Sequence, residues 1–143
     1  MSDGDSTFVQ HNVSAALARR LIEAGAARGA ELGKGFTIAV VDPAGVLKAL
    51  ERMDGAPLIS IQIAQDKAYT AVGFGIPTAG WFDFIKDDPP LAAGATTGID
   101  RLVIFGGGFP ITIDGNVVGG IGVSGGHYSE DADVAQAALN AAT

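Results

Sequence analysis

The chain has 143 residues, which is enough for one domain with a substantial hydrophobic core, and we expect a single domain over residues 1–143. A net charge of −7, with nine basic residues scattered along the chain, argues against nucleic-acid binding, and the absence of cysteine excludes disulfides and thiolate metal sites. No apolar run is long enough to span a membrane and the first residues show no secretory signal, so we expect a cytoplasmic protein.

The N-terminal part predicts one long helix. Residues 1–7 are expected to be a flexible tail, and residues 8–10 a short edge strand. Asn12 or Ser14 can cap a helix that runs to about Leu32, because apolar residues recur at helical spacing between these points and glycines follow.

A hairpin and a second helix are expected next. Residues 36–41 are apolar on both faces and rich in β-branched side chains, which indicates a central strand. The turn signal at residues 42–45 favours a return strand over residues 46–53. Residues 58–74 then show helical periodicity, with one polar and one apolar side.

One lysine on this second helix is its most informative residue. Lys67 lies in the middle of the apolar arc, with Ser60 beside it. A lysine there can extend its ammonium to the surface, form an internal ion pair, with Glu51 as the candidate partner, or serve a pocket as a cation or as a base with a lowered pKa. The last two roles hold together if the ion pair forms a pocket wall.

A long irregular connection is expected over residues 75–100. Connections of that length in compact domains usually have a function or form an interface. This one carries Trp81, Phe82 and Phe84, which we expect either to anchor an oligomer or to form a lid over an aromatic ligand.

The next stretch is a glycine-rich ribbon. Residues 102–105 are expected to be a buried strand, interrupted by the glycines at residues 106–108. Asp114-Gly115 marks a hairpin turn between strands at residues 111–113 and 117–123.

One face of the last strand is nearly bare. Val118, Gly120, Gly122 and Ser124 share that face, so a helix, a neighbouring subunit or a ligand can approach the backbone there. Ser129 is expected to cap a final helix. Together the elements predict an α+β fold with an antiparallel sheet of about five strands flanked by helices.

Two glycine motifs resemble phosphate-binding motifs, but the residues around them lack what such sites require. Gly120, Gly122 and Gly125 match the spacing of a dinucleotide fingerprint, but only 18 residues follow, too few for the further parallel strand the motif needs. The glycines at 106–108 lack the Lys-Ser/Thr of a phosphate loop. A weaker hypothesis remains, in which the amides of Gly125 and Gly126 at the helix start hold a carboxylate.

The chain has two histidines, His11 and His127, which is too few for a three-histidine zinc site, and we expect no metal site. His127 lies beside the glycine pair at the start of the final helix. It could act as a pocket acid or base, ligate haem iron, or be an exposed neighbour of the cap.

Three segments carry a resemblance to a known family: Asp66-Lys67-Ala68-Tyr69-Thr70-Ala71, Phe105-Gly106-Gly107-Gly108-Phe109-Pro110 and Gly120-Ile121-Gly122-Val123-Ser124-Gly125-Gly126. The chain resembles the GlcG/HbpS family over nearly its whole length, and it is also similar to the C-terminal domain of corrinoid-handling propanediol-utilisation proteins. The resemblance implies a profilin-like α/β/α sandwich that forms homo-oligomers, dimers assembling further into a tetramer to octamer. It also implies haem as a candidate cofactor.

Two functions are then expected. The first is an oligomeric protein that binds a flat, largely apolar ligand, with or without carboxylates, for which the resemblance implies haem or a corrinoid. Its candidate ligand-binding residues are Trp81, Phe82, Phe84, Arg52, Gly107, Gly108, Phe109, Ser124, Gly125 and Gly126. The alternative is a cofactor-free lyase, hydratase or isomerase that acts on a small aromatic or organic acid in a catabolic pathway. Its acid/base groups would be Lys67, Glu51 and His127.

Overall fold

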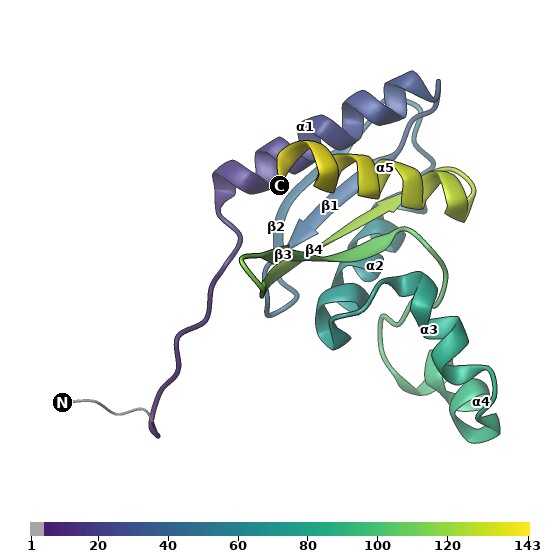
Figure 1. Cartoon of the computed structure of the whole chain (residues 1–143). Helices are drawn as coiled ribbons and strands as arrows, with labels where there is room; N and C mark the ends of the chain where they lie inside the picture. The colour runs from purple at the N-terminus through teal and green to yellow at the C-terminus, as the bar shows by residue number, and fades with distance from the viewer. Residues whose placement is uncertain (1–4) are drawn as a thin grey trace.

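The computed structural model describes residues 5–143 and consists of a four-stranded antiparallel sheet with helices on both faces (Figure 1). The elements in chain order are α1 (Ala15–Glu31), β1 (Thr37–Val41), β2 (Leu47–Arg52), α2 (Ser60–Phe74), α3 (Thr78–Ile85), α4 (Pro89–Gly98), β3 (Gly108–Ile113), β4 (Asn116–Ser124) and α5 (Tyr128–Ala142). The strand order is β2-β1-β4-β3. Helices α1 and α5 cover one face of the sheet and α2 covers the other, which confirms the predicted α+β class.

The sheet has four strands where about five were predicted, because residues 102–105 do not form a strand. Their backbone is tied to helix α2 by one side chain. The hydroxyl of Thr70 accepts a hydrogen bond from Val103 N at 3.0 Å and donates one to Arg101 O at 2.9 Å. Backbone groups satisfied in this way have no need of a neighbouring strand.

The cap of the first helix and the turn and central strand that follow it are confirmed. Ser14 caps α1 by accepting a hydrogen bond from Leu17 N at 3.0 Å. The turn before β2 closes through the bond from Gly45 N to Asp42 O at 2.9 Å, and β1 is buried along its whole length. The main core lies between β1, β4 and the pair α1 and α5.

The predicted edge strand at residues 8–10 is absent. Phe8 and Val9 are 84% and 87% exposed, and the segment bonds to the sheet at Val13, whose N–H donates to Val118 O at 2.8 Å. Of the predicted tail, residues 1–4 lie outside the described part of the chain.

The predicted irregular connection instead contains the two short helices α3 and α4. Asp88 caps α4 through Leu91 N at 3.2 Å, and two prolines occupy its first turn, where a missing N–H costs nothing. Trp81 and Ile85 of α3 pack with Ala95 of α4 in a second, smaller apolar cluster. Among residues 5–143, no helix is long and apolar enough to cross a membrane.

Helix α2 occupies the glycine face of β4, which decides between the three occupants expected there. A Cβ at Gly122 would overlap the carbonyl oxygen of Ala64 and lie 2.6 Å from Ala68 N, so the helix backbone rests directly on the strand. Val118 does not belong to this face as predicted. An irregularity in the β3–β4 pairing next to it accompanies its packing into the main core, on the α1 side.

Candidate functional site

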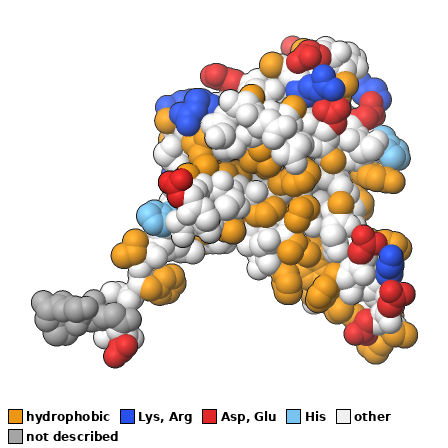
Figure 2. All heavy atoms as spheres, in the orientation of Figure 1, with side chains coloured by type: hydrophobic (Ala, Val, Ile, Leu, Met, Phe, Trp, Pro, Cys, Tyr) orange, Lys and Arg blue, Asp and Glu red, His pale blue; other side chains and the backbone are white. Residues whose placement is uncertain are grey.

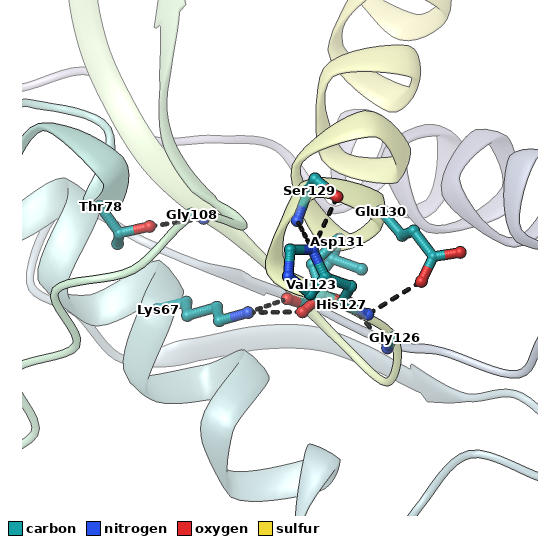
Figure 3. Close-up of polar contacts among 9 residues, drawn as sticks. All are labelled: Lys67, Thr78, Gly108, Val123, Gly126, His127, Ser129, Glu130 and Asp131. Carbon is teal, nitrogen blue, oxygen red and sulfur yellow. Dashed lines mark hydrogen bonds and ion pairs between the residues drawn. The ribbon is translucent and has the colours of Figure 1, made fainter.

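A buried ion pair joins the two helical layers through the sheet. The ammonium of Lys67 on α2 lies 2.8 Å from Oδ2 of Asp131 on α5, and it also donates to the carbonyl of Val123 at 2.9 Å (Figure 3). The two side chains are 0% and 4% exposed. The predicted internal ion pair therefore exists, but its partner is Asp131. Glu51 is exposed on the edge strand β2 and forms no ion pair with Lys67.

The surroundings of the pair are shaped to hold it. The second carboxylate oxygen of Asp131 accepts a hydrogen bond from Gly126 N at 3.0 Å. Gly107, at φ 127°, leaves space for the ammonium, because a Cβ there would lie 2.7 Å from Lys67 Nζ. The ring of Phe105 has its centroid 5.2 Å from the same nitrogen. These contacts connect the ion pair to the segment before β3 and to the glycine loop between β4 and α5.

Burial changes the proton affinity of both partners. It lowers the pKa of Lys67 and raises the pKa of Asp131, because each charged form loses its hydration, and the attraction between the two opposes both shifts. A buried pair with shifts in these directions occurs both as a structural tie and at sites of acid/base chemistry.

Two adjoining depressions open beside this ion pair, and we call them together the α5 groove. The first has a volume of about 370 Å³ and is lined by Pro57, Ile59, Ser60, Ile63, Phe105, Ser124, Gly125, Gly126, His127, Tyr128 and Asp131. The second has a volume of about 390 Å³ and is lined by Ala79, Phe82, Ile104, Phe105, Gly106 and Tyr128. Phe105 and Tyr128 belong to both. Each depression falls at the lower end of the range for ligand pockets, about 300–1,000 Å³.

His127 stands at the rim of the groove and caps α5, the role predicted for Ser129. Its Nδ1 accepts a hydrogen bond from Ser129 N at 3.3 Å and lies 2.8 Å from the Ser129 hydroxyl. Its backbone N–H donates to Glu130 Oε1 at 2.9 Å (Figure 3). The reciprocal bonds form a capping box that orients the imidazole. The N-cap is His127 and not Ser129, because the helix already begins at Tyr128.

The structure brings together five of the predicted site residues in the α5 groove: Ser124, Gly125, Gly126, His127 and Phe82. Lys67, Gly107 and Gly108 lie behind its wall. Gly108 N donates to Thr78 Oγ1 at 3.0 Å, on the side of α3. Their roles in binding or catalysis stay predictions.

The remaining predicted site residues lie elsewhere. Trp81 is buried against Phe74, and Phe84 packs on the outer side of the same aromatic cluster. Phe109 packs against the main core. Arg52 donates two hydrogen bonds to Ala56 O at the far end of the sheet edge. Glu51 lies on that same edge, apart from Lys67.

Sequence reasoning missed Phe105, Tyr128 and Asp131 as site residues. Asp131 was the one with a usable signal. It lies on the buried face of α5 with Val134, Ala135 and Ala138. An acidic residue on one apolar helix face was therefore a candidate partner for a lysine on another. Phe105 and Tyr128 had no comparable signal, since their place depends on how the loop folds over α2.

The described residues contain no group of three or more side chains that could hold a metal ion. A metal bound here would therefore have to bring most of its ligands with it, as the iron of haem does.

Comparisons with known proteins place the chain among relatives of related architecture. Residues 13–140 match the family model described as "Haem degrading protein HbpS-like". Protein GlcG of Escherichia coli strain K12 is 34% identical over 112 residues, which are 78% of this chain and 81% of GlcG. Corrinoid adenosyltransferase PduO of Salmonella typhimurium is 33% identical over 85% of this chain, which spans only 36% of PduO. The crystal structure of a PduOC:heme complex superposes with a TM-score of 0.84 at 32% identity, covering 91% of this chain and 94% of that one.

Proposed function

Because the chain belongs to the HbpS-like family, we propose that it binds haem in the α5 groove. The observation that carries this proposal is the pairing of an apolar, aromatic-lined groove with the imidazole of His127 at its rim. The PduOC relative whose structure contains haem has the same fold at 32% identity and supports the choice of ligand. A corrinoid, the other ring system suggested by the PduO relatives, is the competing ligand.

The donor set of the groove fits a haem group. Nδ1 of His127 is held by Ser129, whereas Nε2 has no hydrogen-bond partner within residues 5–143. The bond from Ser129 N requires an unprotonated Nδ1, so it belongs to the tautomer that carries its proton on Nε2. To hold haem iron, the ring would give up that bond, carry its proton on Nδ1 and donate it to the Ser129 hydroxyl, which would leave the lone pair of Nε2 free. Phe105 and Tyr128 are 46% and 54% exposed and offer ring faces for a planar ligand. Haem would supply an iron centre whose reactivity depends on its axial ligand and on the polarity of the pocket.

Titration with haemin tests the proposal. The wild-type protein is expected to shift the Soret band with saturable binding, and His127→Ala to weaken binding by at least about tenfold, because the side chain that would hold the iron is removed. His11→Ala is the matched control, since His11 is an exposed histidine outside the groove. Equal binding by wild type and His127→Ala, or a loss confined to His11→Ala, would contradict the assignment. Cobalamin binding without haemin binding would favour the competing ligand.

We also propose that the protein is a homo-oligomer. Large apolar side chains remain exposed over α2 and α3, among them Phe74, Phe82 and Phe84 at 57%, 54% and 53%, and hydrophobic side chains gather on this side of the molecule (Figure 2). Patches of this kind usually mark interfaces. Light scattering at micromolar concentration should give a mass of at least twice 14.4 kDa.

A substitution locates the interface in the same experiment. Phe84→Asp is expected to lower the measured mass, whereas Phe8→Asp, on the exposed N-terminal segment, should leave it unchanged. A monomer mass for the wild-type protein would rule out the oligomer. Equal oligomer masses for all three proteins would show that the interface does not include Phe84 on α3.

An enzyme that uses acid/base chemistry is a second candidate function, and its set of acid/base groups differs from the predicted one at one position. Asp131 lines the groove and pairs with Lys67, so it takes the place predicted for Glu51. A carboxyl whose pKa is raised by burial, beside a lysine whose pKa is lowered, is an arrangement found at catalytic sites.

A further inference from the structure

We propose that the α5 groove recognises the uncharged face of a planar ring and forms no ion pair with acidic substituents of its ligand. An esterified tetrapyrrole should therefore bind as tightly as the free dicarboxylate, and small organic acids should not bind. This inference rests on the haem-binding proposal and specifies which part of the ligand the protein reads.

The walls of the groove carry no accessible positive charge. None of the described residues that line the groove is a lysine or an arginine, and Asp131 adds an acidic group to its floor. Lys67, directly behind the floor, has no exposed surface, and its ammonium is already bonded to Asp131 and Val123 O. A ligand carboxylate would thus meet no accessible cation in the groove.

The cations around the start of α5 are also engaged. Lys34 lies 2.8 Å from Glu130, and Arg28 lies 2.9 Å from Asp133. The hydrogen bond from Lys34 lowers the pKa of Glu130, with a further contribution from the backbone N–H of His127, so this carboxylate stays ionised at neutral pH. Both of these basic groups near this end of the helix are therefore matched by an acid of the protein itself.

Amides at the N-terminus of α5, which would otherwise bind an anion, are engaged within the protein as well. Gly126 N donates to Asp131 Oδ1 at 3.0 Å, His127 N to Glu130 Oε1 at 2.9 Å, and Ser129 N to His127 Nδ1 at 3.3 Å (Figure 3). The amide of Gly126, one of the two that the sequence suggested for a carboxylate, is thus occupied by the protein's own Asp131. A ligand carboxylate could bind there only by displacing it.

What the groove offers instead is apolar surface. Ile59, Phe82, Phe105 and Tyr128 all line it, and each is between 46% and 69% exposed. The hydroxyl of Ser60 is used internally, at 2.8 Å from Thr37 Oγ1. The gain on binding therefore comes from covering ring and aliphatic surface, which is indifferent to the charge at the ligand's edge.

The test compares haemin with haemin dimethyl ester in the Soret region, with benzoate as a competing small acid. The two dissociation constants should agree within about threefold, raising the ionic strength should change neither appreciably, and benzoate should not compete. A preference for the dicarboxylate of about tenfold or more, or haemin binding that weakens steeply with salt, would overturn the inference alone. Binding of neither ring would overturn the haem-binding proposal, and the inference with it.

A substitution at the rim of the groove tests where the ligand lies. Ile59→Lys places a cation beside the ligand and should favour haemin over its diester by about twofold to fivefold, the size of an exposed ion pair. Leu58→Lys is the matched control, because Leu58 is 75% exposed but does not line the groove. An unchanged haemin-to-ester ratio in Ile59→Lys, or the same change in Leu58→Lys, would overturn the placement of the ligand along this wall.

Discussion

Replacement of Lys67 by methionine is expected to lower the free energy of unfolding by about 3–5 kcal/mol, because it leaves Asp131 as a buried carboxylate without its counter-ion. The remaining hydrogen bond from Gly126 N satisfies only one of the two carboxylate oxygens. Asp131→Ala should lower the free energy of unfolding by a similar amount, because it leaves the ammonium of Lys67, which is 0% exposed, without its counter-ion. Urea denaturation, read as a shift of the midpoint at constant slope, measures both effects.

Two further proteins make this prediction specific. Lys67→Met combined with Asp131→Leu should recover most of the lost stability, because apolar replacement of both partners removes the buried charge altogether. Asp133→Ala, two residues along the same helix, removes an exposed ion pair with Arg28 and should change stability far less. A double variant as unstable as the singles, or an Asp133→Ala loss as large as that of Asp131→Ala, would show that the buried pair is not the cause.

The second large effect is expected at Gly122 on β4. Gly122→Ala should destabilise the protein by about 3 kcal/mol, the upper end for overpacked sites, because the new methyl group meets backbone atoms of Ala64 and Ala68. Backbone on a packed helix cannot rotate away as a side chain can. The whole of α2 would have to move off the sheet, and the Lys67–Asp131 ion pair would lengthen with it. The midpoint of urea denaturation again measures the loss.

Gly73 on α2 provides the matched control. It is exposed and helical, and a Cβ added there would meet no other described atom within 4 Å. Gly73→Ala should therefore raise the free energy of unfolding by about 0.5–1 kcal/mol through helix propensity alone. If Gly122→Ala were as well tolerated as Gly73→Ala, the direct contact between α2 and β4 would be wrong.

Sequence reasoning went furthest where structure depends on near neighbours. Ser14 caps its helix, the turn at Asp42 closes as expected, and Asp114-Gly115 form the tip of a hairpin with φ of 50° and 82°. These features depend on a few consecutive residues and on backbone preferences that a sequence displays directly. The same reasoning failed over residues 75–105, where two short helices and a tethered segment replace an irregular connection and a strand.

The sequence by itself determined that Lys67 lies in the apolar arc of its helix, where several roles were open to it, and that one face of the last strand would admit something at backbone distance. Only the tertiary structure decided which group pairs with Lys67 and which element covers the glycine face. Asp131 lies 64 residues from Lys67, and α2 covers the glycine face while also carrying that lysine. The α5 groove likewise exists only where the loop after β4, the start of α5 and Phe105 meet. Long-range pairing of this kind depends on how whole elements pack, because each local pattern is compatible with several partners until the layers are assembled.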